Sequence, residues 1–169
     1  MSLPDSIVKG EFWRALPAEV LQQVEDLAQI RDYSAGTILF LEGSLHPEFH
    51  LLAEGHVRLD MLVPNRGRVP ILTVGPGDIL AWSALLGEGI MTASAVAMDR
   101  IRTVAIPGDD LRRLCDQYHT LGFHFMLQLA KAVSHRLVAT RLQLLDLFGE
   151  HVPVLDMVEA VGRPGDPEC

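Results

Sequence analysis

The sequence predicts an α+β protein whose centre is a double-stranded β-helix, that is, a jelly-roll-like β-roll flanked by helices. Three observations predict this fold. Short apolar runs alternate with Gly, Pro and Asn over residues 33–107, a helical pattern precedes them, and a long uninterrupted helical pattern follows. Many short strands separated by turn residues are typical of barrels and sandwiches. The 169 residues are enough for one domain with a full hydrophobic core.

The expected helical lead covers residues 9–30. Pro17 suits the first turn of a helix, and Val20, Val24 and Leu27 then recur at helical spacing. One face of this helix is therefore apolar and is expected to pack on the rest of the domain.

The β-roll is expected over residues 33–107, with glycines at its turns. The predicted strands cover residues 37–41, 49–53, 56–63, 68–74, 92–97 and 101–106. Thr92 and Ser94 stand two positions apart in one of these strands. Because side chains alternate between the two faces of a strand, this spacing predicts that both lie on one face.

A short and a long helix are expected within residues 108–148. At about 1.5 Å per residue the long helix would span roughly 40 Å, more than the domain's own surface requires. One of its edges has the 3-4-3-4 spacing of a coiled-coil seam. The seam residues are Ala130, Val133, Leu137, Thr140, Leu144 and Leu147. We therefore expect a homodimer through this helix, with His135 and Arg136 on a solvated face.

Composition narrows the function. The net charge of −8 disfavours binding of nucleic acid, which needs a basic surface. No apolar run is long enough to span a membrane, and the N-terminus lacks an apolar signal core. The two cysteines form no C-x-x-C pair, and no elbow motif or phosphate-binding loop is present. These features predict a cytoplasmic protein that is not an enzyme and binds no membrane.

Several short motifs occur in one order. Residues 33–40 read YSAGTILF, Glu42-Gly43 follows, residues 49–57 read FHLLAEGHV, and residues 74–79 read VGPGDI. This order resembles the cyclic nucleotide-binding domain of the catabolite activator protein family, which includes bacterial transcription regulators. The resemblance covers about residues 13–149. It implies a signal-transduction domain that binds a cyclic nucleotide between its β-roll, a short helical cassette and a long dimerisation helix.

The cassette departs from the family pattern of F-G-E-L-A followed by R-x-A-x-V. The resemblance assigns the family's glycine, glutamate and arginine to Ala81, Trp82 and Met91. In the family the glutamate accepts the ribose 2′-hydroxyl and the arginine pairs with the cyclic phosphate. Burying a phosphodiester without a guanidinium costs several kcal/mol. Arg141 of the long helix is a candidate replacement, and Thr140 falls where the family often has a hydroxyl facing the purine.

The expected pocket takes residues from the β-roll, the cassette and the long helix. Its residues are Ile79, Leu80, Ala81, Trp82, Ser83, Ala84, Met91, Thr92, Ala93, Ser94, Thr140 and Arg141. A cyclic nucleotide or another small anion would be the ligand. Trp82 either stacks on a ligand ring or fills the space where a ligand would bind.

Two other functions stay open. A degenerate domain closed by Trp82 would serve as a protein-interaction scaffold without any ligand. A cupin-like metal protein would use His46, His50 and Glu54, but the later histidine of that pattern is missing near Gly77, so we expect no metal.

The chain after the long helix also bears on function. Residues 1–149 are expected to form the sensor domain, and residues 150–169 a partly disordered tail. Such a tail is too short for a helix-turn-helix. We therefore expect a stand-alone domain that does not bind DNA itself and acts through a homodimer or a partner protein.

Overall fold

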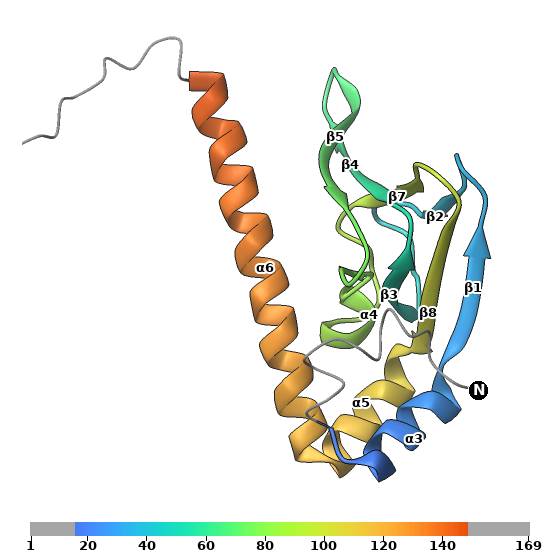
Figure 1. The fold of residues 1–169 in the computed structure, drawn as a ribbon. Helices are drawn as coiled ribbons and strands as arrows, with labels where there is room; N and C mark the ends of the chain where they lie inside the picture. Colours follow the sequence, from blue (N-terminus) through green and yellow to red (C-terminus); the bar gives the residue numbers. More distant parts are fainter. Residues whose placement is uncertain (1–15, 149–169) are drawn as a thin grey trace, which may run out of the picture.

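A computed structural model describes residues 16–148, with side chains described through residue 141 (Figure 1). Its strands form two four-stranded antiparallel sheets. The first sheet has the order β1 (Gln29–Tyr33), β8 (Ile101–Pro107), β3 (Glu48–Glu54) and β6 (Ile79–Leu80). The second has the order β2 (Ile38–Phe40), β7 (Ser94–Ala97), β4 (Val57–Val63) and β5 (Gly67–Val74). This β-roll with its flanking helices confirms the predicted fold class.

Four helices accompany the sheets within residues 16–148. α3 (Ala18–Leu27) and α5 (Gly108–Gln117) lie side by side below the roll, and the long α6 (His119–Phe148) rises beside it (Figure 1). The short cassette helix α4 (Ser83–Leu86) lies between the roll and α5. None of these helices in residues 16–148 is both long and apolar enough to cross a membrane.

Two apolar clusters form the core, one on each side of the first sheet. Phe49 of β3 faces the helices. Its ring packs edge to face on that of Phe125 in α6, with 5.7 Å between the ring centroids. Leu52 of the same strand and Leu80 of β6 point instead between the two sheets. The alternation of side chains along β3 therefore joins the roll to the helices.

A glycine permits the close packing of α5 on the cassette. A Cβ atom on Gly108 would overlap the backbone carbonyl oxygen of Ala84 in α4. The Gly108 amide also donates a 2.8 Å hydrogen bond to the carbonyl of Pro47. The position of the cassette helix thus depends on the absence of a side chain at residue 108.

Most predicted boundaries are shifted by one or two residues, and two of the differences have structural consequences. The helical lead ends at Leu27 rather than residue 30, because Gln29–Tyr33 pair with β8 as strand β1. Residues 9–15 of that lead lie outside the described residues. The expected strand over residues 92–97 begins only at Ser94, since Thr92 lies in a bend. Thr92 is exposed and Ser94 is buried, so the two do not share one face.

Candidate functional site

The cassette begins with an unusual backbone conformation at Ala81. Its φ of +54° is left-handed, although its side chain is buried. Glycine adopts this conformation freely, whereas other residues rarely do. The family pattern has glycine at this position. The chain therefore makes a left-handed bend here with alanine in place of that glycine.

A small pocket lies between the cassette, the roll and α6. The structure brings together seven predicted residues there: Leu80, Ala81, Trp82, Ser83, Met91, Thr92 and Ala93. It adds Phe40, Leu59 and Arg136. The cavity volume is about 30 Å³, which is room for little more than one water molecule. Drug-sized ligands occupy sites of roughly 300–1,000 Å³, so this pocket has to open before it can hold a nucleotide.

The other predicted pocket residues lie elsewhere. Ile79 and Ala84 are buried in the protein core. Ser94 is also buried, and its hydroxyl accepts a 2.9 Å hydrogen bond from the Glu42 amide. Thr140 and Arg141 are exposed on α6, where the Thr140 hydroxyl bonds to a carbonyl of its own helix at 2.8 Å. These two residues do not line the pocket, because an earlier turn of α6 faces it.

Arg136 is the residue by which α6 reaches the cassette. Its guanidinium carbon lies 4.3 Å from the ring centroid of Trp82, and its NH2 group donates to the carbonyl oxygen of Ile79. Burial lowers the pKa of Arg136, and the nearby Asp78 carboxylate partly opposes that shift. The sequence prediction of a solvated Arg136 is wrong, since this side chain is partly buried over the cassette.

The pocket thus has a different charge arrangement from the family pattern. Met91, at the position of the family's phosphate-binding arginine, is 3% exposed and lines the cavity. Arg136 is the only cationic side chain among the pocket's lining residues in the described part of the chain. Among the described residues it contacts the carbonyl oxygen of Ile79 and the aromatic face of Trp82, and no described carboxylate forms an ion pair with it.

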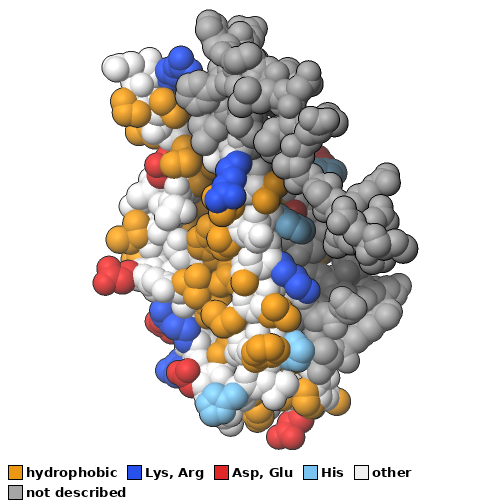
Figure 2. Space-filling view, turned by 90° about the vertical axis from the view of Figure 1, so that its left-hand side faces the viewer, with side chains coloured by type: hydrophobic (Ala, Val, Ile, Leu, Met, Phe, Trp, Pro, Cys, Tyr) orange, Lys and Arg blue, Asp and Glu red, His pale blue; other side chains and the backbone are white. Residues whose placement is uncertain are grey.

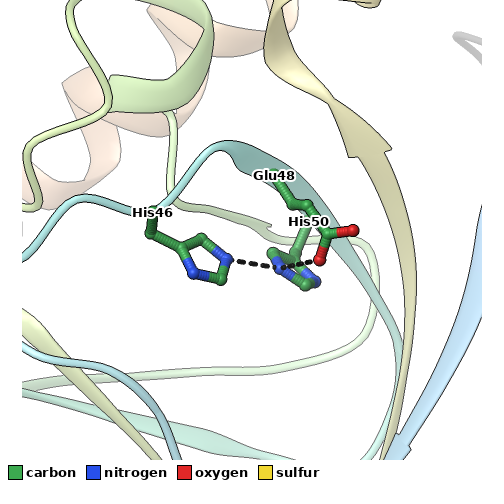
Figure 3. Close-up of side chains that lie close together, drawn as sticks. All are labelled: His46, Glu48 and His50. Atoms are coloured by element: carbon green, nitrogen blue, oxygen red, sulfur yellow. Dashed lines mark hydrogen bonds and ion pairs between the residues drawn. The ribbon is translucent and has the colours of Figure 1, made fainter.

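A separate polar cluster lies at the start of β3 and in the loop before it. The Nε2 atoms of His46 and His50 lie 2.8 Å apart (Figure 3). The Nδ1 atom of His50 lies 3.1 Å from Oγ1 of Thr103. Glu48 receives a 2.8 Å hydrogen bond from Arg31, and its other carboxylate oxygen lies 3.9 Å from Nε2 of His50.

This cluster differs from the predicted set of His46, His50 and Glu54. Glu54 lies apart and faces Arg102 at 3.5 Å, whereas Glu48 joins the two histidines. Burial lowers the pKa of His50 to about 4 and also lowers the pKa of His46.

The predicted dimer seam forms a surface stripe on α6. Ala130, Val133, Leu137 and Thr140 are all exposed. Phe123 and Met126 extend the same 3-4 spacing toward the start of the helix and are exposed as well. Figure 2 shows hydrophobic side chains gathered along this face of the molecule. The side chains of Leu144 and Leu147 lie outside the described residues.

A β-roll with such a cassette is the architecture of a class of small-molecule sensor domains. Similarity to known proteins identifies the family. The sequence pattern of the cyclic nucleotide-binding domain matches residues 30–118. The chain belongs to the cyclic nucleotide-binding domain family. This family is regulatory rather than catalytic.

Known relatives agree with this assignment. The chain is 32% identical over 120 residues to the cyclic AMP receptor protein of Thermus thermophilus, matching 68% of this chain and 56% of that protein. It is 28% identical over 102 residues to cGMP-dependent protein kinase, isozyme 1, of Drosophila melanogaster. That match covers 59% of this chain and only 13% of the kinase.

Solved structures share the fold. A Geobacter metallireducens GS-15 protein, provisionally named a cyclic nucleotide-binding protein, superposes with a TM-score of 0.69 at 29% identity, covering 81% of this chain and 99% of that one. The catabolite activator protein of Thermus thermophilus gives a TM-score of 0.64 at 27% identity, with 83% of this chain and 63% of that chain covered.

Proposed function

We propose that the chain is a cytoplasmic ligand-sensing domain, formed by residues 1–149, that responds to a small anion of the cyclic nucleotide class. The observation that carries the proposal is the contact of Arg136 with Trp82 and Ile79. It joins the ligand cassette to the helix expected to form the dimer. A change at the pocket therefore acts directly on α6.

In this proposal the anion competes for the guanidinium of Arg136. A phosphate accepts charge-assisted hydrogen bonds from arginine, which are stronger than a bond to a neutral carbonyl. Binding would draw Arg136 away from Ile79 and move Trp82, opening the cavity. The ligand would stabilise this open state only by the difference in its affinity for the two states.

The output would pass through a homodimer or a partner protein. The exposed apolar stripe of α6, including Val133 and Leu137, supports dimerisation through this helix. A helix that pairs with its copy and also contacts the cassette would couple ligand binding to the dimer geometry. The net charge of −8 supports signalling by protein contacts rather than by DNA binding of this chain.

Isothermal titration calorimetry tests the ligand. We expect saturable heat with cAMP or cGMP, weakened at least tenfold in Arg136→Met and unchanged in Arg141→Met, because Arg141 is exposed outside the pocket. No heat with either cyclic nucleotide would exclude the nucleotide assignment. Equal binding by Arg136→Met would exclude the competition for its guanidinium.

The pocket volume of about 30 Å³ favours one alternative, a scaffold that binds protein partners and no ligand. In that case Trp82 and Arg136 form a permanent closure of the pocket. A wider panel of nucleotides and small anions would then give no heat with the wild type. The Trp82→Ala chain, in which the closure is removed, would also give none.

A further inference from the structure

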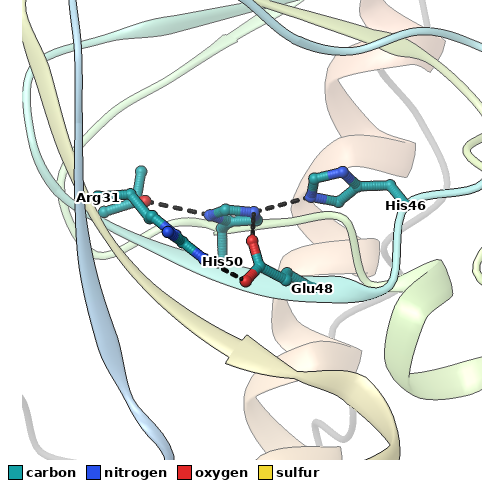
Figure 4. Close-up of polar contacts among 5 residues, drawn as sticks. Arg31, His46, Glu48 and His50 are labelled. Atoms are coloured by element: carbon teal, nitrogen blue, oxygen red, sulfur yellow. Dashed lines mark hydrogen bonds and ion pairs between the residues drawn. The ribbon is translucent and has the colours of Figure 1, made fainter.

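Three metal-ligating side chains lie together outside the proposed pocket. Glu48 and His50 stand two positions apart at the start of β3, a spacing that turns both side chains to one face of the strand, and His46 lies two residues before the strand. One ligand atom from each residue lies within 4.8 Å of the others. Figure 4 shows the imidazole of His46 and the carboxylate of Glu48 both turned toward the imidazole of His50.

The contact of His50 with Thr103 leaves the Nε2 atom of His50 available to bind a metal. Nδ1 of His50 lies 3.1 Å from the hydroxyl of buried Thr103. If the Nδ1–H group donates to that hydroxyl, the lone pair of His50 is at Nε2 and points to His46. Ligating histidines in proteins commonly have such a partner on the other ring nitrogen, which fixes the tautomer.

His46 and Glu48 complete the donor set from the solvent side. Nε2 of His46 lies 2.8 Å from Nε2 of His50, a contact that needs one proton between the two nitrogens. An ion would replace that proton, which moves to Nδ1 of His46 through solvent. The Oε1 atom of Glu48 pairs with Arg31 at 2.8 Å, and its Oε2 atom is the one turned to His50.

We propose that His46, Glu48 and His50 bind a divalent first-row transition metal ion, with Zn²⁺ as its representative. Two histidines and one carboxylate are an established zinc donor set, which leaves a fourth position for water. Nitrogens each about 2.0–2.1 Å from one ion lie roughly 2.9–3.4 Å apart. The imidazoles must therefore separate by a few tenths of an ångström. The Glu48 oxygen must approach His50 by about half an ångström from its present 3.9 Å.

The environment sets the expected strength and place of this site. Arg31 holds one oxygen of Glu48 and adds positive charge, so we expect micromolar rather than tighter affinity. The ring of Phe40 lies 5.1 Å from that of His46 and also lines the proposed ligand pocket. Metal binding is nevertheless independent of that pocket, since none of the three ligands lines it.

Titration of the chelator-treated full chain with Co²⁺ and Zn²⁺ tests the site. We expect one equivalent of Co²⁺ to give a visible absorption band that Zn²⁺ abolishes. His46→Gln keeps an N–H donor for His50 but removes a ligand, and Glu48→Gln removes the anionic ligand. Each is expected to weaken binding at least tenfold. His56→Gln is the control, because the His56 side chain is exposed and pairs with the Asp99 carboxylate at 2.9 Å, away from the three proposed ligands.

Three results would overturn the proposal. These are no saturable binding by the wild type, unchanged affinity in both ligand variants, and an equal loss in His56→Gln. Nitrogen-15 NMR of the histidine side chains is measured on the wild type, so it tests the site even if a variant fails to fold. Zn²⁺ should shift the Nε2 resonances of His46 and His50, and unmoved resonances would contradict the site.

Discussion

Replacing Arg136 by methionine tests the link between α6 and the cassette. Methionine keeps much of the apolar stem but removes the guanidinium. The contact with Trp82 is worth about 0.5–1 kcal/mol at a partly exposed site, and the charged hydrogen bond to Ile79 about 1.5–3 kcal/mol. The cost of burying the charge opposes both, as the lowered pKa of Arg136 indicates. We expect a net loss of about 1–2 kcal/mol in the free energy of unfolding.

Urea unfolding and amide hydrogen exchange measure this effect at one fixed protein concentration, since dimerisation adds to apparent stability. The amides of α6 around Arg136 should exchange faster once the helix is released. Arg141→Met is the matched control and should change stability by less than about 0.5 kcal/mol, because Arg141 is exposed. If Arg136→Met unfolded like the wild type, with unchanged exchange along α6, the proposed link would be refuted.

Three further predictions concern packing, reactivity and assembly. Gly108→Ala should cost about 2 kcal/mol or more in urea unfolding, because its Cβ would meet cassette backbone, whereas Gly75→Ala has space and should cost much less. Burial raises the pKa of Cys115 to about 11, leaving roughly 0.1% thiolate at pH 8. In a Cys169→Ser chain at pH 8, Cys115 should be alkylated at least tenfold more slowly in the folded protein than in the urea-unfolded protein. Equal alkylation rates in the two states would contradict this. Leu137→Glu should yield monomers by sedimentation without loss of helicity, since Leu137 is exposed.

Much of the fold could be predicted from the sequence because glycines and apolar runs mark the strands of the roll. Strand β1 was not recognised, since Gln29, Arg31 and Asp32 make it polar and its pairing with β8 is a long-range contact. Strand β6 consists of Ile79 and Leu80 alone and is too short to show a period.

The candidate site could be predicted only in part. The cassette residues follow from their place in the chain, but the rotation of α6 about its axis decides which arginine reaches them. Arg136 rather than Arg141 faces the cassette, and both have similar helical surroundings in the sequence. For the polar cluster a signal was present. Glu48 stands two residues from each histidine and is closer in the chain to both of them than Glu54 is.

The fluorescence of Trp82 tests the central claim most directly, in a Trp13→Phe chain where it is the only tryptophan. The proposal that an anionic ligand displaces Arg136 from Trp82 predicts a saturable change in emission as cAMP or cGMP is added. The same titration of the chain with Arg136→Met should give a much weaker response. Emission that stays constant with both nucleotides in the parent chain would contradict the proposal and favour a pocket that is permanently closed.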